Sequence, residues 1–115
     1  MQLGQFSISL TVKNIHRSLA FYEKLGFKVI GGNKEHKWLI LQQGKTKIGI
    51  YQDMFPKNIL TFNPDPNEVD IRQIQKELKT QNVKLTRETD ENNNGPGYIS
   101  FCDPDGNQIL IDQGN

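Results

Sequence analysis

Few side chains in this 115-residue sequence could hold a metal ion or attack a substrate. The histidines are His16 and His36, and Cys102 is the single cysteine. His36 follows Glu35, and these two with the distant carboxylate of Asp112 form one conceivable set of three metal ligands. Each of the three is also explained as an exposed surface residue. No base or cation accompanies Cys102, so a small half-buried side chain is a better interpretation of it than a nucleophile.

A second group of residues is suited to binding a small molecule. Hydroxyl, amide and carboxylate groups could donate or accept hydrogen bonds, while Trp38 and Tyr51 offer flat surfaces for stacking. They occupy alternate positions of expected strands and therefore share one sheet face. Trp38 could instead only cover the edge of the core, and Gly49 could mark a bulge. The predicted binding residues are Ser7, Ser9, Thr11, Trp38, Gly49, Tyr51, Ile59, Thr61, Asn63, Leu110 and Asp112.

The elements that must position these residues begin with two strand–helix pairs. Alternation of apolar and polar residues predicts strands at residues 6–12 and 59–63. Asn14 is a suitable N-cap for a helix ending near Leu25, and Gly26 suits the position after its end. Its core-facing stripe would be Ile15, Leu19, Tyr22 and Leu25. A second helix is expected from about residue 67 to 82, with Ile71, Ile74 and Leu78 at helical spacing.

The second part of each half repeats more plainly. Residues 38–41 and 98–101 each lead through a polar turn into six residues, 47–52 and 108–113, that align position for position. The turn at residues 103–106, Asp-Pro-Asp-Gly, is a strong hairpin signal because proline presets φ and glycine accepts a positive φ. With short strands at 27–30 and 83–86, each half is predicted to be a βαβββ module.

One four-stranded sheet with one helix leaves a sheet face uncovered, so we expect the second copy to cover it. The predicted fold class is α+β, with two βαβββ modules pairing into a curved, partly open eight-stranded barrel with outer helices. Module 1 would span about 5–53 and module 2 about 58–114, within one domain of residues 1–115.

Composition narrows the functional classes. The 14 basic and 13 acidic residues give a net charge of +1, and we interpret the two signs as mixed along the chain. This charge distribution gives no support for a nucleic-acid partner. No apolar run could span a bilayer, no signal peptide is visible and no second cysteine allows a disulfide. We therefore expect a cytoplasmic protein with no membrane partner.

The motifs carry a family resemblance. Residues 10–14, Leu-Thr-Val-Lys-Asn, precede the run 18–27, Ser-Leu-Ala-Phe-Tyr-Glu-Lys-Leu-Gly-Phe, and residues 95–98 and 101–107 end the second module. These motifs resemble the glyoxalase/bleomycin-resistance/dioxygenase superfamily, also called the vicinal oxygen chelate proteins, and the likeness covers essentially the whole chain. It implies the paired-module fold, and it does not establish the chemistry, because function belongs to the site.

The resemblance also implies where a metal would be bound. Metal-dependent members carry their ligands on the first and last strands of each module, which places the equivalent positions at Ser7, Gly49, Ile59 and Leu110. None of the four is a usual ligand for a divalent cation. Shifting the alignment by one residue offers no ligand and turns each side chain to the other face. We expect no metal and no cofactor, and the sequence identifies no catalytic residue.

Three functional interpretations follow. The first is a metal-free protein that binds a small planar or amphipathic molecule, similar to the drug-binding resistance members of the superfamily. The second is a glyoxalase- or dioxygenase-type enzyme with relocated metal ligands. The third is a protein-interaction module with no small ligand. A homodimer is a further expectation, because single-domain relatives often pair and exposed sheet edges need cover.

Overall fold

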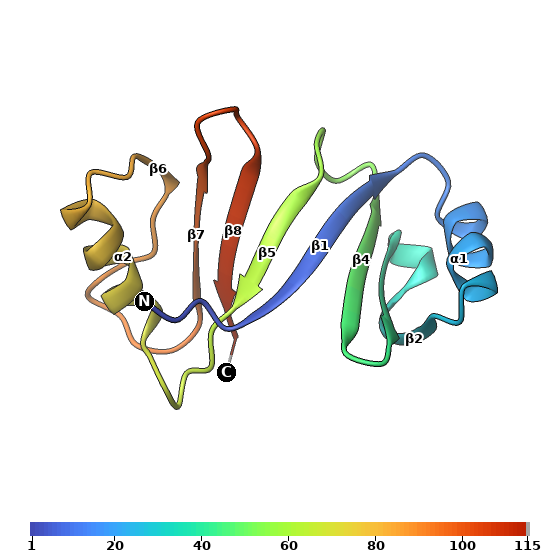
Figure 1. The fold of residues 1–115 in the computed structure, drawn as a ribbon, viewed down its shortest axis with the longest axis horizontal. Helices are drawn as coiled ribbons and strands as arrows, with labels where there is room; N and C mark the ends of the chain where they lie inside the picture. Colours follow the sequence, from blue (N-terminus) through green and yellow to red (C-terminus); the bar gives the residue numbers. More distant parts are fainter. Residues whose placement is uncertain (115) are drawn as a thin grey trace. The chain divides into compact units, whose positions relative to one another are not determined.

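Two compact units form the computed structural model, which describes residues 1–114. The N-terminal module comprises Ser7–Ile59, and the C-terminal module combines Met1–Phe6 with the chain from Leu60 onward. In chain order the elements are β1 (Gln5–Val12), α1 (Ile15–Lys24), β2 (Lys28–Asn33), the 3-10 turn η1 (Lys34–His36), β3 (Trp38–Gln43), β4 (Thr46–Gln52), β5 (Ile59–Asn63), α2 (Ile71–Thr80), β6 (Leu85–Arg87), β7 (Gly97–Cys102) and β8 (Gln108–Gln113) (Figure 1). The α+β class and the repeated βαβββ order are confirmed.

The strand order is the same in both modules. The N-terminal strands are ordered β2-β3-β4-β1, with β1 parallel to β4 and the other pairs antiparallel. The C-terminal strands are ordered β5-β8-β7-β6, with β8, β7 and β6 antiparallel in turn. Trp38 pairs with Tyr51 as Tyr98 pairs with Asp112, so the predicted alignment of 47–52 with 108–113 holds in the hydrogen-bond register.

Each helix covers one face of its own sheet. In the N-terminal module, Ile15 and Leu19 of α1 pack with Leu39, Leu41 and Ile50. In the C-terminal module, the buried cluster consists of Ile71, Ile74, Leu78, Ile99, Phe101 and Ile111. We call the opposite face of each sheet, which its own helix does not contact, the uncovered face of that module.

Helix boundaries follow the capping residues. The Asn14 side chain accepts a hydrogen bond from the Arg17 N–H, and Gly26 after the helix end has φ +98°. Leu25 is the C-cap residue and is 51% exposed, so its predicted place in the core-facing stripe was wrong. Because its backbone has already left the helix, its side chain no longer follows the helical stripe.

The second helix begins later than expected. Asp70, not Asn67, is its N-cap, and the Asp70 carboxylate accepts a hydrogen bond from the Arg72 N–H. Residues 65–69 form a separate turn, in which Asp65 accepts from the Asn67 N–H. The helical spacing from Ile71 to Leu78 was correct, and the predicted start near residue 67 was too early because the preceding residues form this turn.

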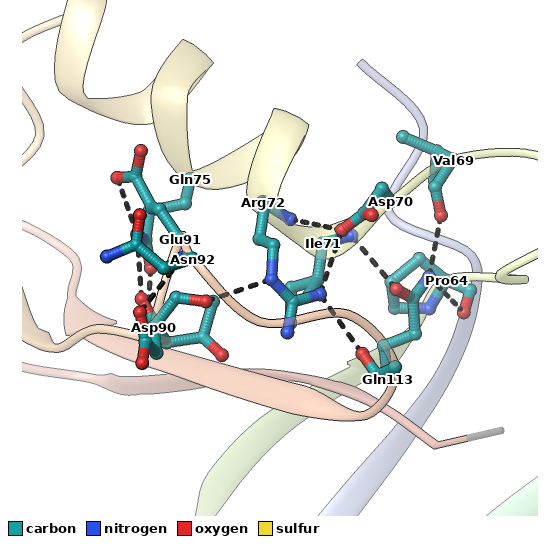
Figure 2. A network of polar contacts seen from close by, with 12 residues as sticks. Pro64, Val69, Asp70, Ile71, Arg72, Gln75, Asp90, Glu91, Asn92 and Gln113 are labelled. Carbon is teal, nitrogen blue, oxygen red and sulfur yellow. Dashed lines mark hydrogen bonds and ion pairs between the residues drawn. The ribbon is translucent and has the colours of Figure 1, made fainter.

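Buried polar side chains hold the loop between β6 and β7 against α2 (Figure 2). The Arg72 guanidinium donates to the backbone oxygens of Asp90 and Gly95, while the Gln75 amide donates to the Thr89 oxygen and accepts from the Thr89 N–H. The loop between β6 and β7 is thus held at Thr89, Asp90 and Gly95.

Neither helix among residues 1–114 has the length and apolar character needed to cross a membrane.

Candidate functional site

The uncovered face of the N-terminal sheet carries rows of side chains set by the strand register. Tyr51 on β4 pairs with Trp38 on β3 and with Thr11 on β1. Two residues earlier on β4, Gly49 pairs with Ile40 on β3 and with Ser9 on β1. Five predicted binding residues, Ser9, Thr11, Trp38, Gly49 and Tyr51, therefore lie on one face of one module. Ser7 lies on the same face by strand alternation, two residues before Ser9.

Three aromatic rings form a ladder on this face. The rings of Trp38 and Tyr51 are parallel within 5° with centroids 6.3 Å apart, and Phe55 lies 5.2 Å from Tyr51 at a tilt of 52°. All three side chains are half-buried. Such offset and tilted arrangements are the favoured ones for aromatic pairs. We call Trp38, Tyr51 and Phe55 the aromatic ladder.

The polar groups beside the ladder position the linker between β4 and β5, residues 53–58, which carries Phe55. The Thr11 hydroxyl donates to the Phe55 backbone oxygen at 3.0 Å, and the Thr11 N–H donates to the Asn58 side-chain oxygen at 3.0 Å. Thr11 thus holds the linker, a role not anticipated from the sequence. Phe55 itself was missed, although an aromatic residue in the short segment between the two predicted modules was a signal that could have found it.

Gly49 does not leave the open space that its missing side chain suggests. A Cβ atom at Gly49 would lie 2.6 Å from Cε1 of Tyr51, because the Tyr51 ring folds back over the glycine. Gly49 therefore lies on the predicted face but leaves no open space there for a ligand. The tyrosine ring occupies the room itself.

The positions where metal ligands were implied do not fit a metal ion. In the N-terminal module, Ser7 offers only a hydroxyl and Gly49 is covered by the Tyr51 ring. Ile59 and Leu110 carry no donor atom. Across residues 1–114, no cluster of three or more His, Cys, Asp or Glu side chains could hold a metal ion.

The C-terminal module presents a different uncovered face. Tyr98 pairs with Asp112 across β7 and β8, and the Arg87 guanidinium lies 4.2 Å from the centre of the Tyr98 ring. The Asn63 amide donates to the Asp112 backbone oxygen at 2.9 Å. Leu110 pairs with Ser100, and Thr61 is a buried residue of β5. Asn63 and Asp112 are thus brought together.

Asp112 lies beside two surface hollows of about 550 and 480 Å³. Partial burial raises the pKa of the Asp112 carboxyl above its usual value. The carboxylate is therefore easier to protonate than an ordinary aspartate. The first hollow is also lined by Asn63, Asp65 and Glu68, and the second by Arg87, Glu88, Asp90 and Tyr98.

The remaining candidate residues are exposed. His16 lies on the first turn of α1, and His36 ends η1, where the Asn33 side chain caps the turn by accepting from the Glu35 N–H. Cys102 is exposed as well, so the expected half-buried position was wrong. Its sulfur accepts a hydrogen bond from the Gln108 amide at 3.2 Å, at the end of β7.

Charge differs sharply between the modules. Residues 1–59 contain nine lysines or arginines and three acidic residues, a net charge of +6, whereas residues 60–115 contain five and ten, a net charge of −5. The description of charges as mixed along the chain is thus corrected, because the near-zero total hides two opposite halves. A basic module favours anionic ligands.

Comparisons with known proteins agree with this architecture. The family model described as Glyoxalase/Bleomycin resistance protein/Dioxygenase superfamily matches residues 3–111. No curated protein matches the chain. Among solved structures, the chain is similar to an NAD-dependent benzaldehyde dehydrogenase from Legionella pneumophila, at 17% identity and a TM-score of 0.74, covering 96% of this chain and 99% of that one.

Two further solved structures show the same fold. A hypothetical protein from Bacillus halodurans C-125 has 17% identity and a TM-score of 0.70, covering 95% of this chain and 92% of that one. A glyoxalase/bleomycin resistance protein/dioxygenase superfamily member from Vibrio splendidus 12B01 has 16% identity and a TM-score of 0.66, covering 95% and 97%. At these identities the structures support the fold alone. With the family model matching nearly its full length, the chain belongs to the glyoxalase/bleomycin resistance protein/dioxygenase superfamily.

Proposed function

We propose that this protein binds a small planar molecule on the uncovered face of its N-terminal module, without a metal ion. The observation that carries the proposal is the aromatic ladder. Its three half-buried rings lie on the sheet face away from α1, where a flat ligand could stack on or extend them.

The alternatives have less support. A metal-dependent enzyme with relocated ligands would need donors, and residues 1–114 offer no cluster of three. A protein-interaction module gains support from the Tyr51 ring, which fills the space over Gly49 with the protein's own atoms. Binding by the family's drug-resistance members suggests bleomycin, which carries a flat heteroaromatic segment, as one probe.

Calorimetric titration with bleomycin and with neutral 2-naphthamide tests the proposal. We expect saturable binding of at least one of them at one molecule per chain. Replacing Trp38 or Tyr51 with leucine should weaken that binding about two- to tenfold each, since an aromatic contact contributes about 0.5–1.5 kcal/mol in addition to the apolar area that it buries. Phe21→Leu, an exposed aromatic change on α1, is the matched control and should leave binding unchanged.

The results separate the three interpretations. Binding that needs both ladder residues supports the proposal. No heat of binding from either probe, or equal binding by the Trp38 and Tyr51 variants, would overturn it and favour the interaction module. Stoichiometric nickel, zinc, manganese or iron retained after removal of the excess metal would instead support the metal-dependent enzyme.

A further inference from the structure

A lysine shares the sheet face of the aromatic ladder. Ile48 packs against the N-terminal core, whereas the ring of Tyr51 folds over Gly49 on the other face. Because side chains alternate along a strand, Lys47 lies on the same face as Gly49 and Tyr51. Lys47 is half-buried, and Gln42 is its register partner on β3.

The spacing between Lys47 and the ladder suits one small molecule. Lys47 lies four residues before Tyr51 on β4, which places their Cα atoms about 13 Å apart. The flexible four-carbon stem of a lysine lets the ammonium approach the ladder along the sheet. A ring system stacked at Tyr51 would therefore have a cation near its far end.

Polar and aromatic side chains share this face with Lys47. The face itself presents hydroxyls, an amide, an aliphatic side chain and the ladder, from Ser7, Ser9, Thr11, Gln42 and Ile40. With a module charge of +6, the field on this face favours an anion.

We propose that the preferred ligand is a planar aromatic anion, with its ring on the aromatic ladder and its carboxylate or sulfonate group at Lys47. This inference rests on the proposed function and adds the ligand's charge and its orientation. The repeat supplies a contrast within the same chain. In the C-terminal module, Gln108 and Asp112 occupy the positions of Lys47 and Tyr51, so these two positions carry neither a cation nor a ring.

Three probes of one shape and different charge test the inference by calorimetric titration: 2-naphthoate, 2-naphthamide and 2-naphthylmethylammonium. We expect the anion to bind about tenfold or more tightly than the neutral amide, since hydrogen bonds to charged groups contribute about 1.5–3 kcal/mol. The cation should bind most weakly. Added salt should weaken naphthoate binding and leave naphthamide binding unchanged.

Variants assign the preference to Lys47. Lys47→Met should remove the advantage of naphthoate over naphthamide, and Lys47→Arg should retain it. Lys45→Met removes an exposed cation from the neighbouring β3–β4 turn and serves as the control that keeps the preference. Unchanged circular dichroism and Tm would show that each variant is folded.

The failures can be told apart. If naphthamide binds as tightly as naphthoate, or if Lys47→Met keeps the preference while folded, this inference is overturned and the proposed function stands. If none of the three compounds binds while bleomycin does, this inference is overturned and the proposed function stands; if bleomycin fails to bind as well, both are overturned.

Discussion

The two modules share a scaffold and differ in the face that their helices leave uncovered. Gln52 and Gln113 end equivalent strands, and the side-chain oxygen of each accepts a hydrogen bond from the first residue of its module's helix, Ile15 at 2.8 Å and Ile71 at 2.9 Å. On the uncovered faces, the stacked Trp38 and Tyr51 correspond to Tyr98 and Asp112. The positions that build the module repeat, and the positions that could bind a ligand do not.

The largest effect should come from removing the repeated glutamine in the C-terminal module. Gln113 is buried and also donates to the backbone oxygens of Pro64 and Val69. Gln113→Ala should cost about 3 kcal/mol of unfolding free energy, because several buried polar groups lose partners. The side chain of half-buried Gln52 accepts the hydrogen bond from the Ile15 N–H, and Gln52→Ala should cost about 1 kcal/mol. Urea unfolding measures both, and equal costs would contradict the difference between the modules.

A smaller effect should follow from making α2 more like α1. Buried Gln75 occupies the place that Leu19 has in the other helix, and it holds Thr89 by two hydrogen bonds. Gln75→Leu should cost about 1–3 kcal/mol, because it leaves the Thr89 backbone without these partners. Hydrogen exchange at the Thr89 amide should accelerate. Unchanged exchange would show that Arg72 alone holds the loop.

Gly49→Ala tests the ladder rather than stability. The new methyl would meet the far end of the Tyr51 side chain, which can rotate away, so the unfolding free energy should change by less than about 1 kcal/mol. The ring displacement should alter the tryptophan environment, and near-ultraviolet circular dichroism should register it. An unaltered spectrum would indicate that Tyr51 and Trp38 are not coupled.

The smallest effect concerns pH and the β7–β8 turn. A hydrogen bond from the Asn107 amide is the main cause that lowers the pKa of the Asp103 carboxyl below its usual range. A carboxyl whose pKa is lowered by folding stabilises the fold when ionised, and that contribution is lost as the pH falls below about 4. The β3–β4 turn has no such carboxylate. Asp103→Asn should therefore flatten the fall in Tm between pH 5 and 3, and an unchanged slope would contradict this assignment.

The scaffold could be predicted from sequence because its signals are local or repeated. Asn14 and Gly26 marked the first helix, and the alignment of 47–52 with 108–113 predicted the register. The binding face could be predicted only in part, since strand alternation identifies a face but not how side chains fill it. The folding of Tyr51 over Gly49 and the approach of Phe55 depend on contacts between separate segments. The prediction that Leu25 faces the core was wrong for a different reason, because the helical stripe does not continue into the C-cap residue.

The central claim is that a planar ligand binds the N-terminal face and not its repeat. Amide and indole chemical shifts recorded during a titration with 2-naphthoate test this directly, and Trp38 gives the single indole N–H signal of the chain. The account predicts saturating shifts at the Trp38 indole and at the amides of Thr11, Gly49 and Tyr51, with smaller shifts at Tyr98, Leu110 and Asp112. Larger shifts at the C-terminal residues, with the Trp38 indole unmoved, would contradict it.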